Sequence, residues 1–256
     1  MILQEKQLLT ALVITYNEEQ NIKKVLADLA FADEIIVIDS FSLDKTFKIA
    51  SSYQNVKVAQ RSFDNFASQR NYALSLASNS WILFIDADER LTPELQQEIS
   101  IIIHQRNAAS AYYMRRSFMF ENQKLRFSGW QTDKIIRLFK KENAHYNIRK
   151  IVHEKLVVSG KIGKLKNRLI HHSYSTYEDY KQKMILYGKL KAQEELLKNT
   201  RPNFFHFYIR PGYQFLNQYL LRLGILDGKK GFVICYLNAL SVAVRFQELK
   251  KIRSKN

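Results

Sequence analysis

The stretch Trp81–Arg90, with the sequence WILFIDADER, limits the folds open to this chain more than any other stretch. Its first five residues are apolar and polar residues precede it, which is typical of a strand buried in a parallel sheet. The run ends in three carboxylates within four residues, Asp86, Asp88 and Glu89. Open α/β sheets bind their ligands at this carboxyl edge of the strands. The stretch therefore predicts an α/β fold with a ligand site where the strand ends.

The clustered carboxylates have two interpretations. They repel one another, and a hard divalent cation such as Mg²⁺ or Mn²⁺, which prefers oxygen ligands, would neutralise them. The alternative is an acidic turn before a helix that Thr92 caps and Pro93 begins, with Glu94 favoured by the helix dipole. Because that helix begins after the sequence DAD, it leaves the two aspartates unexplained. We therefore expect Asp86 and Asp88 to bind a metal.

Strands and helices alternate over the first 109 residues. Apolar runs predict strands at Leu8–Ile14, Glu34–Ile38, Asn55–Ala59 and Trp81–Asp86. Helical patterns follow them at Glu18–Ala30, from Ser42 onward, at Asp64–Ala77 and from Pro93 onward. In the third helix we expect Asp64 to be the cap and Phe66 to face the core. This alternation predicts right-handed βαβ units and a mainly parallel sheet.

The pattern changes after Ser110. Four further strands are predicted without helices between them, at Ala111–Phe120, Lys134–Phe139, Ile151–Val158 and Arg168–His172. They indicate a mixed extension of the sheet. A helix is predicted over Tyr177–Asn199, with a packing stripe of Tyr177, Tyr180, Met184 and Tyr187. We expect one domain over residues 1–175, divided into halves 1–109 and 110–175, and a helical extension over 176–256.

The segment Phe204–Phe246 is aromatic and apolar but is interrupted by Gly, Pro and Lys residues. Its longest uninterrupted stretch, Gly231–Val244, has 14 residues, which is too short to span a bilayer. Two short amphipathic helices with basic flanks could lie in a membrane interface instead. Packing against the rest of the protein is the alternative.

Charge is distributed unevenly along the chain. The net charge is +16, yet residues 1–100 carry 9 Lys/Arg against 14 Asp/Glu, and residues 201–256 carry 10 against 2. Such a basic part suits nucleic acid, an anionic membrane or a phosphorylated acceptor. The single cysteine, Cys235, excludes an internal disulfide framework and suits a reducing cytoplasm. The N-terminus lacks an export signal pattern, so we expect a cytoplasmic protein.

Three strand ends bring chemically useful side chains to one edge of the predicted sheet. They carry Tyr16 with Glu18, then Asp39, and finally Asp86 with Asp88. An aromatic ring can stack on a base, a carboxylate can accept from a base N–H, and a metal can bind a diphosphate. These features favour a nucleotide-diphosphate site. Neither GxGxxG nor GxxxxGK[ST] occurs, which weakens dinucleotide and P-loop interpretations.

The same residues carry a family resemblance. The segments LVITYNEEQNI, VIDSFSLDKT, FASQRNYAL and WILFIDADERL, in this order and spacing, resemble the inverting family 2 glycosyltransferases of GT-A fold. The later IIRLF, VHEKL and LIHHSYS are similar to bacterial lipopolysaccharide-core glycosyltransferases of the WaaE-like group. The resemblance covers residues 8–175. Phe41 departs from it, because many members have Gly in this turn.

The resemblance implies roles for particular residues. Thr15, Tyr16 and Glu18 would border the base and ribose of a nucleotide-diphospho-sugar donor, and Asp39 would face the base edge. Arg70 would lie near the diphosphate. Asp86 and Asp88 would hold the metal, with His153 as a further metal or phosphate contact. Each has a simpler alternative. Glu18 could favour a helix N-terminus, Asp39 could cap a turn, Arg70 could be a surface cation, and His153 could be an ordinary strand residue.

An inverting transfer also needs a general base that deprotonates the acceptor hydroxyl, usually a carboxylate. Glu154 in VHE matches the family's motif position, and Asp133 in GWQTD is the second candidate.

We therefore expect a metal-dependent hexosyltransferase that acts in cell-envelope biosynthesis on a saccharide or lipid-linked acceptor, at the cytoplasmic face of the inner membrane. Two alternatives stay open. A nucleotidyltransferase has similar needs, but its glycine-rich, lysine-containing loop is missing here. A basic, non-catalytic module for nucleic acid or membrane would leave the carboxylates at the strand ends unexplained, so no nucleic-acid partner is expected.

Overall fold

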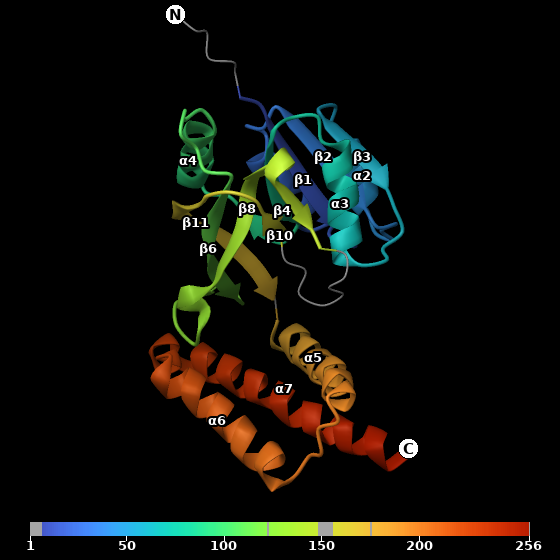
Figure 1. The fold of residues 1–256 in the computed structure, drawn as a ribbon, viewed down its shortest axis with the longest axis vertical. Coiled ribbons are helices and arrows are strands. Elements are labelled where there is room, and N and C mark those ends of the chain that lie inside the picture. The colour runs from blue at the N-terminus through green and yellow to red at the C-terminus, as the bar shows by residue number, and fades with distance from the viewer. Residues whose placement is uncertain (1–6, 122, 148–155, 175, 256) are drawn as a thin grey trace, which may run out of the picture. The chain divides into compact units, whose positions relative to one another are not determined.

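The computed structural model describes residues 7–121, 123–147, 156–174 and 176–255 of the chain (Figure 1). The chain forms two compact units, and each is built from two chain segments. Unit 1 comprises Met1–Arg116 and Lys134–His171, and unit 2 comprises Ser117–Asp133 and His172–Asn256.

The main β-sheet is mixed. Its strands are β1 (Leu9–Thr15), β2 (Glu34–Asp39), β3 (Val56–Gln60), β4 (Trp81–Asp86), β5 (Glu89–Arg90), β6 (Ala111–Phe120), β7 (Gln123–Leu125), β8 (Lys134–Lys140) and β11 (Ile162–Tyr174). Their order is β3-β2-β1-β4-β8-β6-β11-β5, and β7 pairs with β6. The first four strands in this order are parallel, whereas β8 is antiparallel to β4 and β6. The predicted parallel sheet with a mixed extension is confirmed. A second sheet pairs β9 (Ala144–Tyr146) with β10 (Leu156–Val158).

Strand β4 is buried on both faces, as its uninterrupted apolar run predicts. Side chains alternate across a strand. Trp81, Leu83 and Ile85 therefore join the core that also contains residues of the helices α1 (Ile22–Asp28), α2 (Thr46–Ser51) and α4 (Pro93–Ile103). Ile82 and Phe84 join the core formed with helix α3 (Phe66–Leu76) on the other side. All five side chains are at most 1% exposed, so β4 is held firmly and its last residue has a fixed position.

The helices of unit 1 are α1 (Ile22–Asp28), α2 (Thr46–Ser51), α3 (Phe66–Leu76) and α4 (Pro93–Ile103), with a 3₁₀ turn, η2, at Lys141–Asn143. Helix α4 begins as predicted. The Thr92 side chain accepts a hydrogen bond from the Leu95 N–H at 3.3 Å, and Pro93 is the first helical residue.

The start of α3 differs from the prediction. Asn65, and not Asp64, caps this helix by accepting a hydrogen bond from the Ser68 N–H at 2.9 Å. The reason is that the Asp64 carboxylate pairs with the Arg61 guanidinium at 3.0 Å. The expectation that Phe66 faces the core was also wrong, because it is 48% exposed.

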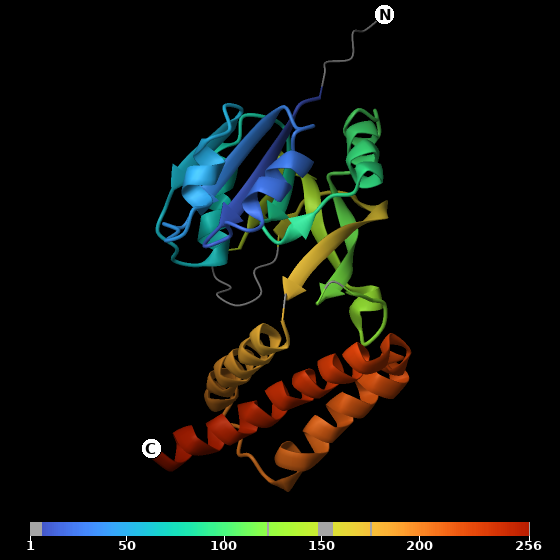
Figure 2. The same cartoon turned by 180° about the vertical axis from the view of Figure 1, so that it is seen from behind.

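Unit 2 contains long helices. They are α5 (Tyr177–Leu197), α6 (Arg210–Leu216) with π-helical turns η3 (Phe205–Ile209) and η4 (Asn217–Leu221) at its ends, and α7 (Gly228–Lys255), alongside the 3₁₀ turns η1 (Trp130–Thr132) and η5 (Gly224–Asp227). Helix α7 packs against both α5 and α6 (Figure 2). Its Ile234 and Leu237 form a core with Tyr180 and Met184 of α5.

Helix α7, with 28 residues, extends beyond the 14-residue stretch Gly231–Val244, and the segment Phe204–Phe246 contains two helical stretches, one around α6 and one in α7. Gly231 does not interrupt it, because this glycine serves packing. A Cβ atom there would lie 2.0 Å from the Gly224 carbonyl oxygen. By length and composition alone, the 31-residue helical segment Gly224–Ser254 could cross a membrane, although 33% of its apolar window is buried inside the structure. The 14-residue stretch therefore underestimated the apolar helix.

Candidate active site

The ends of three parallel strands meet at one edge of the sheet in unit 1. Strand β1 lies between β2 and β4. In this register Thr15 is level with Asp39, and Ile14 is level with Asp86. The predicted convergence of these strand ends is confirmed.

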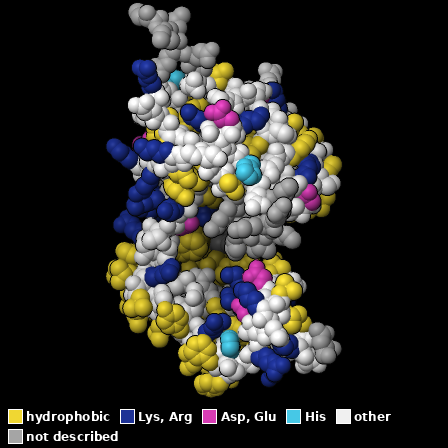
Figure 3. Space-filling view, viewed as in Figure 1, with side chains coloured by type: hydrophobic (Ala, Val, Ile, Leu, Met, Phe, Trp, Pro, Cys, Tyr) yellow, Lys and Arg dark blue, Asp and Glu magenta, His cyan; other side chains and the backbone are white. Residues whose placement is uncertain are grey.

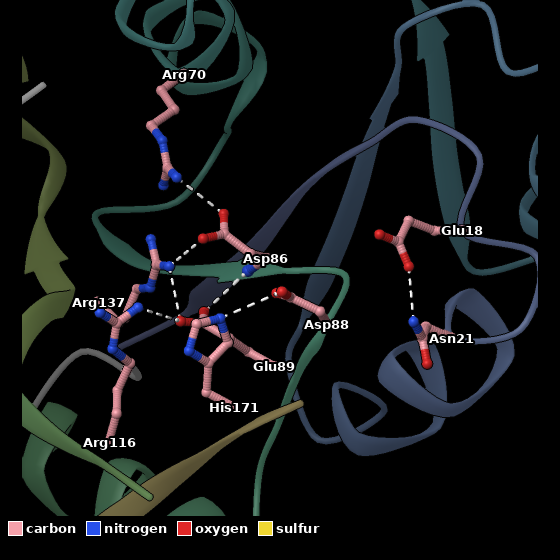
Figure 4. Close-up of polar contacts among 9 residues, drawn as sticks. All are labelled: Glu18, Asn21, Arg70, Asp86, Asp88, Glu89, Arg116, Arg137 and His171. Carbon is pink, nitrogen blue, oxygen red and sulfur yellow. Dashed lines mark hydrogen bonds and ion pairs between the residues drawn. The ribbon is translucent and has the colours of Figure 1, made fainter. Parts of the chain in front are cut away.

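Two arginines hold the Asp86 carboxylate (Figure 4). Arg70 of α3 donates to Oδ1 at 2.9 Å, and Arg137 of β8 donates to Oδ2. Burial alone would raise the pKa of Asp86, but the charges of Arg137 and Arg70 outweigh it and lower the pKa well below its usual range. Asp86 is therefore ionised at neutral pH, and part of the counter-charge that the sequence assigns to a metal comes from arginine.

Arg137 also joins Asp86 to Glu89, which follows the DAD turn. It donates to the Glu89 carboxylate at 2.8 Å, and both side chains are at most 1% exposed. The second Glu89 oxygen accepts from the Asp86 backbone N–H at 3.0 Å. Arg116 lies 3.7 Å from the same carboxylate. Glu89 therefore fixes the turn from inside.

Asp88 faces a histidine from a distant strand. The short strand β5 pairs with β11 so that Glu89 is level with His171. This register places His171 Nε2 3.2 Å from Asp88 Oδ2. The Asp88 side chain is 29% exposed and that of Asp86 is 27% exposed, so both carboxylates of the DAD sequence are partly open to a ligand.

Glu18 adds a further negative charge to this edge. Its carboxylate accepts from the Asn21 amide at 2.7 Å. Burial, followed by the negative charges of Asp88, Asp44 and Asp86, raises the pKa of Glu18 above its usual value despite that hydrogen bond. The region around Glu18 and Asp88 thus has an excess of negative charge that a cation would relieve.

The loop after β1 is held by the turn after β2. The Glu18 N–H donates to Thr46 Oγ1 at 2.7 Å, and the Leu43 N–H donates to the Asn17 amide oxygen at 2.8 Å. These bonds leave Tyr16 in the connecting loop, 52% exposed and accessible to a ligand.

Asp39 is fully buried, and its carboxylate binds the turn that follows β2. It accepts from the Ser42 N–H at 3.1 Å and from the Gln60 amide at 3.0 Å. This arrangement corresponds to the turn-capping alternative. Within the same turn Phe41 has φ +60°, the left-handed conformation that favours glycine.

Three predicted residues remain, Asp133, His153 and Glu154. Asp133 follows the 3₁₀ turn η1 and belongs to unit 2. His153 and Glu154 lie outside the described residues.

The carboxylates at this edge suit a divalent cation whose remaining coordination positions are filled by water or by a bound substrate. Among the described residues, no cluster of three His, Cys, Asp or Glu side chains could hold a metal ion alone. Mg²⁺, however, usually keeps several waters and binds one or two carboxylates together with substrate phosphates. Asp86 and Asp88, with Glu18 near enough to feel their charges, offer such a partial site.

Sequence reasoning assigned no role to Arg137 or His171. A signal existed for Arg137, because it is a charged residue inside the otherwise apolar IIRLF. Nothing in the LIHHSYS sequence indicates that His171 meets Asp88, since their contact depends on the register between β5 and β11.

Comparison with known proteins gives consistent matches. The family model "Glycosyl transferase family 2" matches residues 10–160. An uncharacterized glycosyltransferase of Rickettsia typhi is 28% identical, with 97% of this chain and 88% of that protein covered. The lipopolysaccharide core biosynthesis glycosyltransferase LpsC of Rhizobium meliloti is also 28% identical, with 93% and 92% covered. The crystal structure of S. aureus TarS 1–349 in complex with UDP has a TM-score of 0.50 at 16% identity, with 98% of this chain and 92% of that chain covered. The last match shows a common fold.

Proposed function

Since the chain belongs to glycosyl transferase family 2, we propose that it transfers a sugar from a nucleotide-diphosphate donor to a hydroxyl group and inverts the anomeric centre. The observation that carries the proposal is the edge where the β1, β2 and β4 ends meet. It combines an exposed aromatic ring, a partly open carboxylate pair and buried arginines in one place.

In this proposal the donor lies across the three strand ends. Tyr16 stacks on the base, Thr15 and Glu18 border the base and ribose, and Arg70 lies near the diphosphate. Asp39 supports the base edge by holding the turn after β2. TarS was crystallised with UDP, which makes uridine donors the first to test.

Asp88 and Asp86 would hold Mg²⁺ or Mn²⁺, which would stabilise the negative charge of the leaving diphosphate. Arg137 keeps Asp86 ionised and in place, and Glu89 fixes the turn between the two aspartates. The protein would therefore contribute a preorganised, negatively charged binding site for the cation.

The metal assignment predicts the effect of removing one carboxylate. Asp88→Asn should abolish transfer and chelator-sensitive donor binding while the protein stays folded, because a hard anionic ligand is lost. Glu142→Gln, an exposed carboxylate in unit 1, is the matched control and should behave like wild type. Donor titration with and without chelator measures both effects. Full activity of Asp88→Asn, or of wild type in excess chelator, would refute the assignment.

For the chemical step, we propose that Glu154 removes the proton of the acceptor hydroxyl. The hydroxyl oxygen attacks the anomeric carbon, the bond from that carbon to the diphosphate breaks, and the proton moves to the carboxylate. Asp133 is the second candidate for this role.

Glu154→Gln should lower kcat by about 10²–10⁴-fold, the usual contribution of general base catalysis, with little change in donor affinity. Asp133→Asn is the comparison variant. If kcat falls in Asp133→Asn but not in Glu154→Gln, Asp133 is the base instead of Glu154. If both variants keep the wild-type kcat, neither carboxylate is the base.

We further propose a saccharide or lipid-linked acceptor of the cell envelope, because LpsC, named for lipopolysaccharide core biosynthesis, is similar over nearly the whole chain. Residues 1–175 would be the catalytic domain, with a nucleotide-binding half (1–109) and an acceptor half (110–175). The helical extension 176–256 would hold the enzyme at the cytoplasmic face of the inner membrane, in peripheral contact with anionic lipid.

A further inference from the structure

Unit 2 exposes much apolar surface along α6 and the helical turns before and after it, η3, η4 and η5. Six side chains between Phe204 and Leu226 are each at least 53% exposed, and we call them the apolar patch: Phe204, Tyr208, Tyr213, Leu216, Leu221 and Leu226. Hydrophobic side chains gather on the face of unit 2 where α6 lies (Figure 3). Contiguous exposed apolar surface of this kind marks an interaction site.

The inward side of the same helix is already covered. Phe215 packs edge-on against Phe232 of α7, with ring centroids 5.4 Å apart, and Phe207 packs against the core that contains Phe246. The apolar patch is therefore additional to the surface that unit 2 needs for its own folding.

The charged residues of the segment 201–226, which carries the apolar patch, are all cations. Residues 201–226 contain no Asp or Glu, and they include the exposed cations Arg201, Arg210 and Arg222. A symmetric contact between two copies would bring like charges together. An anionic lipid surface would complement these cations, while the aromatic rings would settle at the level of the headgroups.

Unit 2 also has a shallow cavity between η4 and the start of α7. Tyr219, Phe232 and Val233 supply apolar walls, and Lys229 and Gly228 complete the lining of a space of about 350 Å³. Apolar walls beside one ammonium group suit an amphiphile with an acyl chain and an anionic head.

The structure favours contact in the plane of the interface over a membrane-spanning α7. Ile234, Leu237 and Phe246 of α7 are fully buried against the rest of unit 2. Asn238 also accepts a hydrogen bond from the Tyr180 hydroxyl at 2.7 Å. A spanning helix would have to give up this packing.

We propose that the apolar patch docks unit 2 onto an anionic phospholipid bilayer, with α6 lying in the interface and α7 covering its inner side. This inference deepens the membrane location proposed above by naming the surface that makes the contact. It does not depend on the transfer chemistry.

The test is sedimentation of the full-length protein with phosphatidylcholine vesicles that contain or lack phosphatidylglycerol, at low and high salt. Wild type should bind only in the presence of phosphatidylglycerol and more weakly at high salt. Tyr208→Ser/Leu221→Ser/Leu226→Ser should bind at least about tenfold more weakly, because three side chains lose their transfer into the interface. The control Leu43→Ser/Ile101→Ser/Leu197→Ser removes three exposed apolar side chains elsewhere and should bind like wild type.

Two double variants that each remove two positive charges test the electrostatic contribution to membrane binding. Arg201→Gln/Lys229→Gln should weaken binding by roughly fivefold per charge, whereas Lys161→Gln/Lys164→Gln in unit 1 should not. Thermal melting confirms that each variant is folded.

Three results would overturn the proposal. They are wild type that stays in the supernatant with every vesicle, a patch variant that binds like wild type, and a lipid-free dimer that the patch variant abolishes. Nucleoside diphosphate release measured without lipid reports on the transferase proposal separately, so the two can fail independently.

Discussion

At Glu18, burial and like charge act in the same direction on one carboxyl group. The side chain is half-buried, and the negative charges that help to raise its pKa are those of Asp88, Asp44 and Asp86. Because the pKa of Glu18 is raised in the folded state, the folded protein holds this proton more tightly than the unfolded chain. Ionised Glu18 therefore destabilises the fold at neutral pH. That cost is absent below the usual Glu pKa of 4.5 and grows as pH rises through the raised value.

We predict that Glu18→Gln is more stable than wild type at neutral pH and loses this advantage below about pH 4.5. The amide keeps an oxygen that can accept from Asn21 but carries no charge. Melting temperatures over a pH series measure the difference, with Glu19→Gln as the neighbouring control. An advantage that persists unchanged into acid would show that charge is not its cause.

The residue-scale features divide into those that the sequence reveals and those that it conceals. Asp86 and Asp88 were predictable, because an apolar run followed by DAD marks a strand end from one segment alone. Their partners Arg137 and His171 were not, because each arrives from a strand more than 45 residues later through antiparallel pairing. Which charge neutralises Asp86 is decided by tertiary structure.

At the scale of elements, local patterns predicted the strands well, and β4 and β6 begin and end where expected. The length of α7 was underestimated, because the Gly and Lys residues just before Gly231 look like interruptions in the sequence. In the structure Gly231 permits a close approach to Gly224. A glycine's role in packing becomes visible only when its neighbour is known.

Two helical glycines of unit 2 give a matched prediction. A Cβ on Gly188 of α5 would lie 2.7 Å from the Ser241 carbonyl oxygen of α7, whereas Gly212 of α6 has no atom within 4 Å. Gly188→Ala should destabilise the protein. Forcing an extra methyl group into this packed position costs about 1–3 kcal/mol, whereas the higher helix propensity of alanine stabilises the helix by at most about 1 kcal/mol. Gly212→Ala should stabilise by up to about 1 kcal/mol. Urea unfolding measures both, and equal effects would contradict the close α5–α7 packing.

At the scale of the whole molecule, the chain combines a nucleotide-type sheet edge in unit 1 with an apolar, cationic surface in unit 2. The first hundred residues are net acidic and the last fifty-six strongly basic, and this asymmetry is typical of a chain whose two parts contact different ligands. The sequence alone could not separate a membrane-facing helix from a packing helix, because both have apolar residues at the same spacing. The structure adds burial to the comparison: Ile234, Leu237 and Phe246 of α7 are buried, whereas the six side chains of the apolar patch are exposed.

The proposed reaction, transfer from a nucleotide-diphospho-sugar at the β1, β2 and β4 ends, is tested most directly by assaying the protein with a panel of such donors. Each donor is incubated with a saccharide-lipid extract and with Mg²⁺, Mn²⁺ or chelator. We predict metal-dependent release of nucleoside diphosphate and a product with inverted anomeric configuration by NMR. Release of pyrophosphate from a nucleoside triphosphate, a retained configuration, or no consumption of any donor would contradict this reaction.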